Sequence, residues 1–269
     1  MRGASRQSFA QAVERLEPLI AADGALPLGQ QLLQVVGVLG SSSPLRKALT
    51  EPSRSVGDKQ QLLKSILGSH VSDTTLDVVG GLIESQWSRS GDLVDAAERL
   101  GVISLAGSAQ NERRMDEVED QLFRFSRILA GNHDLQRALN NPDAPNQAKA
   151  RLVEDLLGDR VAVEAVAMIG QAAVHPRGKT TAAVLESYGE ILASRRAREI
   201  ATVTVAKPLA PEQVERLGAA LSRTYGRELV LNIQINPEIV GGLKVQVGDE
   251  VVDGSVATRL DDVRRRLAS

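Results

Sequence analysis

Residues 241–255 read Gly-Gly-Leu-Lys-Val-Gln-Val-Gly-Asp-Glu-Val-Val-Asp-Gly-Ser, and this stretch decides the fold of the C-terminal part of the chain. Leu243, Val245 and Val247 alternate with polar residues, a period of two that predicts a half-buried strand. Gly248 and the aspartate after it provide turn chemistry, because glycine tolerates positive φ and aspartate can hydrogen-bond to its own backbone. The two valines after the turn begin a return strand. We therefore predict a β-hairpin.

A final helix is predicted after this hairpin, with Asp253 or Ser255 as its N-cap. Four apolar residues recur there at helical spacing: Val256, Leu260, Val263 and Leu267. This stripe and the apolar face of the hairpin are expected to bury one another. The whole segment is therefore predicted to be structural, without a cluster of acids, bases or nucleophiles.

A strand, a helix and another strand are predicted before the hairpin. Residues 201–206 alternate and are rich in β-branched side chains, which favours a strand. Pro211 stands near the first position of the helix that follows. The second strand has the most regular alternation of the chain, in Leu229, Leu231, Ile233 and Ile235. A strand–helix–strand order implies a crossover and a parallel pair, so residues 199–269 are predicted to form a small α/β domain.

The rest of the chain carries helical periodicity. Residues 92–130 contain no proline and only Gly101 and Gly107 as weak points, so they predict one long helix or two nearly continuous helices. The second half of this segment has a regular apolar seam: Met115, Val118, Leu122, Phe125 and Leu129. Such a seam is typical of a helix that packs along another helix.

An internal repeat organises the helical part. The segment Leu45-x-x-Ala48-Leu49-x-x-Pro52 recurs 90 residues later as Leu135-x-x-Ala138-Leu139-x-x-Pro142, and the lysine, leucines and glycine that follow recur at the same offset. We predict two related helical units, residues 1–110 and 111–198. The expected fold is therefore mainly α, with a duplicated helical-bundle region followed by the small α/β domain.

Composition limits the function. The net charge is -2, so no global field attracts nucleic acid or an anionic bilayer. The chain has no cysteine and only three Phe, two Tyr and one Trp, which argues against thiolate sites and base stacking. Apolar runs fall short of the ~20 residues that cross a bilayer, and the N-terminus lacks the apolar run of a secretory signal. We expect a cytoplasmic protein whose membrane role, if any, is peripheral.

No catalytic, cofactor-binding or metal-binding residue is predicted. Gly178-Lys179-Thr180 matches the tail of a phosphate-binding P-loop, but Ala173 stands where the first glycine belongs, so a helix–helix loop is expected there. The three histidines, His70, His133 and His175, lack partners at ligand spacing and are expected at the surface or in loops. The arginines of 195–198 and 264–266 are predicted to lie on a solvated face, with a protein interface as the alternative.

Six residues of the C-terminal stretch carry a family resemblance: Gly241, Gly242, Gly248, Asp253, Gly254 and Ser255. Together with the apolar residues between them, they resemble the C-terminal signature of the delta subunit of F-type ATP synthases. Ala206-x-Pro208-Leu209 and the repeated Leu-x-x-Ala-Leu-x-x-Pro segment are similar to other marks of that family. The resemblance spans nearly the whole chain, and the doubled helical region resembles actinobacterial delta subunits.

The resemblance implies a non-catalytic stator subunit without cofactors, at the cytoplasmic face of the cell membrane as a peripheral part of the synthase. Its implied partners are the N-terminal helices of the alpha subunits, held by the helical domain, and the b-subunit stalk, held by the C-terminal domain. In the family, the alpha helix binds in a groove between the first and fifth helices. The matching residues here are Phe9, Val13, Leu16, Val79, Leu82, Ile83 and Trp87. Taken one by one, each of them fits plain core better than a binding groove.

Two other classes of function stay open at this point. A helical adaptor or regulator outside the synthase would show the same helical periodicity and the same lack of catalytic residues. A nucleotide-binding enzyme is the third alternative, because of the partial P-loop tail.

Overall fold

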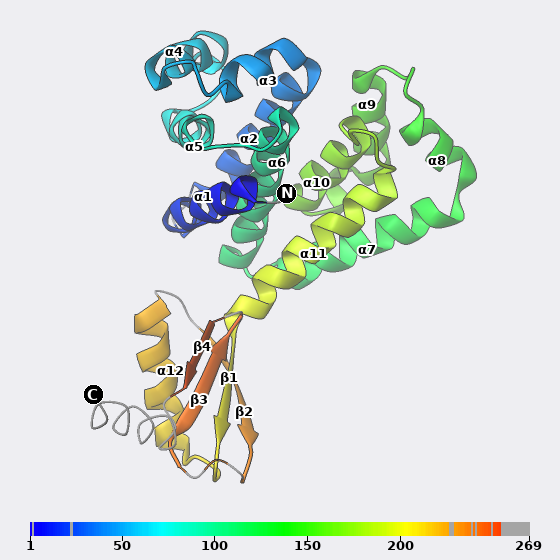
Figure 1. Ribbon diagram of the computed structural model, residues 1–269. Coiled ribbons are helices and arrows are strands. Elements are labelled where there is room, and N and C mark those ends of the chain that lie inside the picture. The colour runs from blue at the N-terminus through cyan, green and yellow to red at the C-terminus, as the bar shows by residue number, and fades with distance from the viewer. Residues whose placement is uncertain are drawn as a thin grey trace. The chain divides into compact units, whose positions relative to one another are not determined.

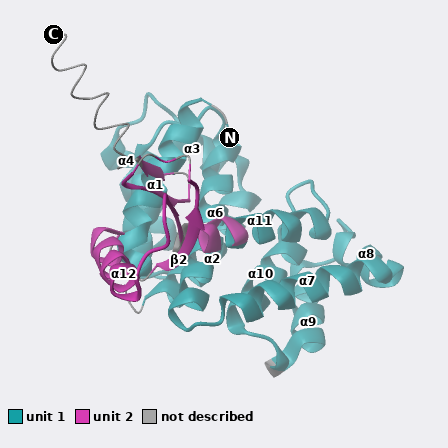
Figure 2. Cartoon of the chain, turned by 90° about the horizontal axis from the view of Figure 1, so that it is seen from below, with its two compact units in different colours: residues 1–192 teal, residues 193–269 magenta. Residues whose placement is uncertain are grey.

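The chain folds into two compact units, Met1–Leu192 and Ala193–Ser269 (Figure 2). The computed structural model describes residues 1, 3–21, 24–225, 229–237, 239, 241–248 and 250–253. Helices make up the first unit, and a small sheet with one helix makes up the described part of the second (Figure 1). The predicted fold class, mainly α with a C-terminal α/β region, is confirmed.

The helices of the first unit follow the predicted repeat. The first six are α1 Ala4–Ile20, α2 Ala25–Ser41, α3 Ser43–Thr50, α4 Val56–Leu67, α5 Asp73–Glu84 and α6 Ser90–Asn111. After them come α7 Met115–Gly131, α8 His133–Asn140, α9 Asn146–Leu157, the 3-10 helix η1 Gly158–Arg160, α10 Val163–Val174 and α11 Thr181–Glu199. From α2–α5 to α7–α10, every helix start and every helix end is displaced by 90 residues.

The two copies also share hydrogen bonds at equivalent positions, 90 residues apart. Gln31 Oε1 accepts from the backbone N–H of Ser72 at 2.8 Å, and Gln121 Oε1 accepts from that of Ala162 at 2.9 Å, each partner 90 residues on. Arg46 donates to the last carbonyls of α2, and Gln136 donates in the same way to those of α7. The first bond is made by a glutamine in both copies, and the second by an arginine in one copy and a glutamine in the other.

One helix belongs to both copies. α6 adds Leu93, Val94, Ala96, Ala97 and Leu100 to the core formed by α1–α5. Further along, it adds Val102, Leu105, Ala106 and Ala109 to the core formed with α7–α11. We call these two assemblies the first bundle (α1–α6) and the second bundle (α6–α11). Because α6 takes part in both cores, the division at residue 110 stays a prediction that these contacts do not decide.

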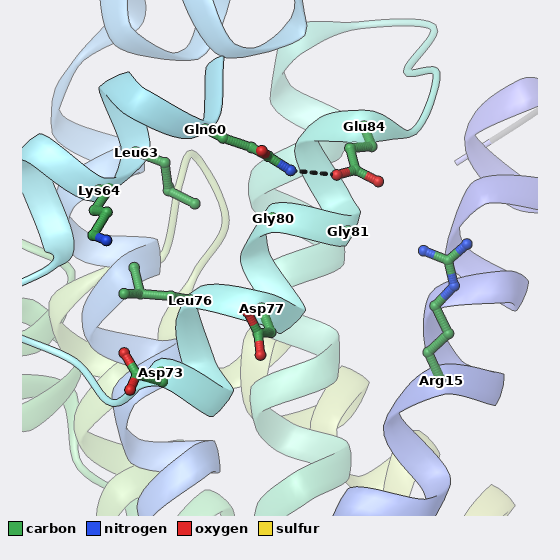
Figure 3. A pocket seen from close by; sticks show the side chains of 10 residues that line it. All are labelled: Arg15, Gln60, Leu63, Lys64, Asp73, Leu76, Asp77, Gly80, Gly81 and Glu84. Carbon is green, nitrogen blue, oxygen red and sulfur yellow. Dashed lines mark hydrogen bonds between the residues drawn. The ribbon is translucent and has the colours of Figure 1, made fainter. Parts of the chain in front are cut away.

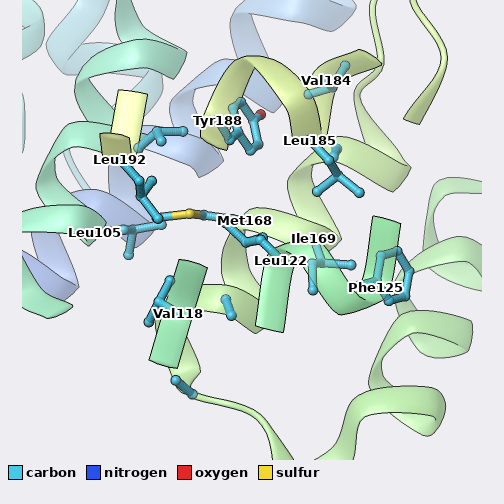
Figure 4. Close-up of a cluster of buried hydrophobic side chains, with 14 of the residues drawn as sticks. Leu105, Val118, Leu122, Phe125, Met168, Ile169, Val184, Leu185, Tyr188 and Leu192 are labelled. Carbon is cyan, nitrogen blue, oxygen red and sulfur yellow. The ribbon is translucent and has the colours of Figure 1, made fainter. Parts of the chain in front are cut away.

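The second core gathers side chains from α6 to α11 and from Leu33 of α2. In Figure 4, Met168 of α10 lies among Leu105 of α6, Leu122 of α7 and Leu192 of α11. All four are buried. The apolar seam predicted on α7 points into this core, as expected for a helix packed along others.

Of the two predictions for residues 92–130, the second is confirmed: they form two nearly continuous helices, α6 and α7, with a break between them. Residues 112–114 form the break, and Arg113 there has φ 56°, a left-handed conformation that glycine usually supplies. The backbone N–H of Arg114 donates to Ala109 O at 2.7 Å and closes the end of α6. Gly101 and Gly107, the suspected weak points, lie inside α6 and do not interrupt it.

The second unit contains β1 Ile200–Val205, α12 Pro211–Tyr225, β2 Val230–Ile235, β3 Leu243–Val247 and β4 Glu250–Asp253. The strand order is β2-β1-β3-β4. β1 pairs in parallel with β2 and antiparallel with β3, and β3 pairs antiparallel with β4. The predicted crossover pair and the predicted hairpin are both confirmed.

The signature glycines have conformations that other residues rarely adopt. Gly241 has φ 150°, Gly242 has φ 83° and Gly248 has φ 59°, so a side chain at these positions would be strained. Val245 and Val247 are buried as predicted, whereas Ile235, the last residue of β2, is 55% exposed. Two signature residues, Gly254 and Ser255, lie outside the described residues, as do Asp249 and the predicted final helix.

Candidate functional site

The seven residues predicted to line a groove meet in the first bundle, at different depths. Leu16, Val79, Leu82 and Ile83 are fully buried in its core. Phe9, Val13 and Trp87 are half-buried and pack against that core from outside. A partner that docks here can therefore touch the three outer residues, while the four inner ones support them.

The two outer aromatic rings are held by contacts of their own. Trp87 lies beyond the end of α5, not on it, and its Nε1 donates to Leu82 O at 2.7 Å. The guanidinium of Arg99 lies 5.0 Å from the centre of the Phe9 ring, within cation–π range. Both rings are thus fixed in place before any partner arrives.

A pocket of about 450 Å³ opens beside α5 (Figure 3). Its walls come from α4 and α5, and Arg15 of α1 lies on the far side of α5. Gly80 is itself buried, yet a Cβ built on it would meet no atom within 4 Å, whereas a Cβ built on Gly81 would lie 3.2 Å from Arg15 Nη1. Gln60 donates to Glu84 Oε1 at 2.6 Å at one end of the pocket. Apolar periodicity did not predict that these residues line a pocket. The sequence feature that could have indicated it is the pair Gly80-Gly81 inside a predicted helix.

The second bundle has the corresponding pocket, of about 350 Å³. Eight of its lining residues stand 90 positions after residues that line the first pocket: Ala150, Val153, Glu154, Val166, Ala167, Gly170, Gln171 and Val174. The third wall differs between the two. Arg15 of α1 forms it in the first pocket, and Gln30, Leu33 and Gln34 of α2 form it in the second.

The difference arises because α2 packs on the second bundle. Leu105 is the counterpart of Arg15, and α2 covers it by placing Gly29 directly against it. His175, after the end of α10, lies against Gly37 of α2. The face of the second bundle that corresponds to the α1–α5 face of the first is therefore covered by the chain itself.

The predicted P-loop tail lies in the loop between α10 and α11, as expected. Arg177 in this loop forms ion pairs with Asp95 and Glu98 of α6, and Tyr188 of α11 donates to Glu98 Oε1 at 2.6 Å. Burial raises the pKa of Tyr188, and the positive charge of Arg177 lowers it only in part. These contacts join the loop and α11 to α6.

Three other predictions concern charged or titratable groups. His175 lies in the loop after α10, one of the two predicted places; it is half-buried, and burial lowers its pKa below the usual value. Arg195 is buried, so a solvated face is the wrong prediction for it, because its side chain is only 8% exposed. Arg264–Arg266 lie outside the described residues.

The described ranges contain neither a metal-binding cluster nor a membrane-spanning helix. Within them, no three His, Asp or Glu side chains come close enough together to hold a metal ion. Within the same ranges, no helix combines the length and apolarity that crossing a bilayer requires.

A model of the family described as ATP synthase delta (OSCP) subunit matches residues 102–267. The chain is 44% identical to the ATP synthase subunit delta of Streptomyces coelicolor over 271 residues, which covers 100% of this chain and 99% of the relative. It is 42% identical to the ATP synthase subunit delta of Thermobifida fusca over 268 residues, with 100% of both chains covered. A chain in the cryo-EM structure of the Toxoplasma gondii mitochondrial ATP synthase hexamer matches with TM-score 0.33 and 20% identity, over 62% of this chain and 95% of that chain.

Proposed function

Because the chain belongs to the ATP synthase delta (OSCP) subunit family, a non-catalytic part of the peripheral stalk, we propose that it links the catalytic head to the b-subunit stalk. The first bundle holds an amphipathic N-terminal helix of an alpha subunit between α1 and α5. The second unit, residues 193–269, binds the b subunit. The chain works at the cytoplasmic face of the cell membrane, so that rotation within the complex drives ATP synthesis.

The observation that carries this proposal is the difference between the two equivalent faces. The family match begins inside α6 and takes in the second bundle, so α6 and α10 correspond to the first and fifth helices of the family. In this chain α2 already lies on that face. On the first bundle a pocket opens beside α5 with Arg15 of α1 in its lining, and Gly80 leaves room there, because a Cβ built on it would meet no atom within 4 Å.

The charge of Arg15 indicates which kind of side chain the incoming helix carries. In the described part of the chain, Arg15 forms no ion pair, and its guanidinium lies within reach of the open face of α5 beside Gly81. A carboxylate on the incoming helix would pair with it. Apolar side chains of that helix would contact the outer rings of Phe9 and Trp87 and fill the space beside Gly80.

Substituting Gly80→Ala tests the head contact. A Cβ at this position meets nothing in the chain alone, so the fold is expected to keep its stability or gain from the better helix propensity of alanine. The same methyl group would obstruct a helix docked on α5. Binding to the isolated catalytic head is expected to weaken at least tenfold by surface plasmon resonance.

The control for this test is Gly189→Ala on α11, where an added Cβ also meets nothing. We expect its affinity for the head to stay within twofold of the unsubstituted chain. Equal affinities for the Gly80 and Gly189 variants would refute the α1–α5 contact.

Binding to the b subunit is tested by truncation after residue 198. The shortened chain is expected to keep its affinity for the head and to lose the b subunit in a pull-down with purified b. Retention of b by the shortened chain would place the b contact on the helical unit instead.

A further inference from the structure

The two equivalent pockets have different chemistry. In the first, the pair Gln60 and Glu84 forms a hydrogen bond across the pocket end, and Asp77 adds another charge. The residues 90 positions later are Ala150, Val174 and Ala167, which are all aliphatic. The pocket of the second bundle is therefore aliphatic at three positions where the equivalent pocket of the first bundle is polar.

Contact with α2 does not account for this change. Ala150 is exposed, and α2 forms only the wall that contains Leu33. The apolar substitutions continue beyond the pocket to Val163, which is 39% exposed and corresponds to Asp73 of the first bundle. Apolar side chains in a groove open to water add little to the stability of the free chain, whereas a partner that covered the groove would bury them.

A second observation points the same way. Gln171 lines the second pocket where the first has Gly81, so its amide is an addition to this copy. The side chain is 7% exposed, and its Nε2 has no hydrogen-bond partner among the described residues. A buried donor without a partner lowers the stability of the free chain. An acceptor brought by a docked molecule would satisfy it.

The dimensions of the groove suit a helix. α9 and α10 have 12 residues each, about 18 Å at the 1.5 Å rise per residue of a helix, and the pocket lining follows α10 from Val166 to Val174, about 12 Å of that length. Two packed helices that leave an apolar groove are the usual receptor for an amphipathic helix. Glu154 is the charged residue of the lining, so the rim attracts a cation.

We propose that the groove between α9 and α10 is a second docking site, which takes an amphipathic helix of about three turns from another subunit of the synthase. That helix places aliphatic side chains over Val166 and Ala167, a neutral acceptor such as a serine hydroxyl or a glutamine carbonyl opposite Gln171, and a lysine or arginine beside Glu154. The inference uses membership of the synthase stalk and does not depend on the α1–α5 contact.

The absence of cysteine from the chain allows a direct test. Ala150→Cys places a thiol in the groove, and Ala148→Cys places the same thiol on the opposite side of the same helix, also exposed. We expect maleimide to label both variants rapidly in the free chain. In the purified synthase, labelling of the Ala150 variant is expected to slow at least tenfold, while the Ala148 variant keeps its rate. Equal rates for the Ala150 variant in the two states would overturn the proposal.

Crosslinking identifies what covers the groove. A thiol-to-amine crosslinker attached to the Ala150 variant is expected to join it, in the purified synthase, to a lysine in a helical segment of a different subunit, identified by mass spectrometry. A crosslink to a second copy of this chain, or protection without any protein crosslink, would exclude a partner helix.

Two substitutions separate docking from a purely structural role. Gln171→Leu removes the unpaired amide, so the free chain should melt at a higher temperature while the variant is incorporated less efficiently into the synthase. Ala167→Asp restores the charge found at Asp77 and should reduce incorporation at least tenfold, with Ala148→Asp as the unaffected control. A stabilised Gln171 variant that assembles normally would contradict the role given to the amide.

The Gly80→Ala variant should keep the protection of the Ala150 thiol wherever it still assembles, so failure of one docking site is distinguishable from failure of the other.

Discussion

Gly29 on α2 lies so close to Leu105 on α6 that a Cβ built on the glycine would be 2.8 Å from Leu105 Cγ. The contact is reciprocal. A Cβ built on Gly101 of α6 would be 2.8 Å from Leu33 Cδ2 of α2. Gly29 of α2 therefore receives Leu105 of α6, and Gly101 of α6 receives Leu33 of α2. On each helix, the glycine and the leucine are four residues apart. This close crossing holds α2 on the second bundle and keeps the α6–α10 face covered.

The first prediction concerns this crossing. Gly29→Ala places a methyl group against Leu105 and against Gly101 O, 3.0 Å away, so the helices must separate. Overpacking of this kind costs about 1–3 kcal/mol, more than the roughly 1 kcal/mol of helix propensity that alanine gains. Urea unfolding should show a net loss of stability. Gly40→Ala on the same helix meets no atom within 4 Å and should be neutral or stabilising. Similar midpoints for both variants would mean that the crossing is looser than described.

The second prediction concerns the break between α6 and α7. Arg113 is exposed and has φ 56°, a conformation that costs a non-glycine residue about 1–2 kcal/mol. Arg113→Gly should raise the melting temperature, with a gain of about 0.5–1 kcal/mol after the greater freedom of glycine in the unfolded chain is counted. Arg113→Ala keeps the strain and should leave stability unchanged. A gain for alanine equal to that for glycine would show that loss of the charge, not relief of strain, is responsible.

The third prediction concerns Asp92, whose side chain is 2% exposed at the start of α6. Burial by itself raises its pKa, but a hydrogen bond from Ser5 Oγ at 2.8 Å and the hydrogen bond and charge of Arg89 outweigh burial, so the pKa is lowered. A carboxyl whose pKa is lower in the folded state stabilises the fold above its unfolded pKa of about 3.9, and this contribution is lost as pH falls through the folded pKa.

Asp92→Asn should therefore destabilise the chain at pH 7, by about 1–3 kcal/mol for the lost charged hydrogen bonds. The difference from the unsubstituted chain should shrink below pH ~4. Chemical unfolding at a series of pH values measures it. Asp134→Asn, on a 92% exposed side chain, is the control and should have little effect at any pH. A difference that stays constant down to pH 2 would show that the carboxylate charge is not the cause.

The fourth prediction concerns Tyr188. Its hydroxyl is buried and donates to Glu98 Oε1, and burial raises its pKa above the usual 10. A group whose folded pKa is raised contributes stability that is present below the unfolded pKa and is lost as pH rises above it. The unsubstituted chain should therefore lose stability above pH ~10 more steeply than Tyr188→Phe. At pH 7 the variant should be less stable by about 1.5–3 kcal/mol, the usual range for a hydrogen bond to a charged group. Parallel stability curves above pH 10 would refute this assignment.

Local sequence pattern was sufficient to predict the C-terminal sheet and the helical repeat. Alternation in residues 243–247 and the turn glycine Gly248 specify the hairpin, because strand period and turn chemistry are properties of neighbouring residues. The repeated Leu-x-x-Ala-Leu-x-x-Pro segment located α3 and α8 for the same reason. The break at Arg113 was not predictable, since an arginine there gives no glycine signal, and Gly101, which did give one, serves helix packing instead.

The candidate site was harder to predict because periodicity selects what is buried. Leu16, Val79, Leu82 and Ile83 have the strongest helical spacing in their segments, and for that reason they lie inside the bundle. The open pocket beside α5 is lined mainly by polar residues and by two glycines, which have no periodicity. Coverage of the equivalent face by α2 follows from contacts between residues 29 and 105, which no local pattern relates.

The sharing of α6 by two cores has a mechanical consequence. Tandem domains normally yield at the linkers between them, where few contacts resist bending. Here the connection is a single 22-residue helix, about 33 Å long, with side chains fixed by packing on both of its halves. Load applied to one bundle passes to the other through continuous hydrogen-bonded backbone. Duplication has thus lengthened the helical unit without adding elastic compliance, which is what a stalk that must resist twisting requires.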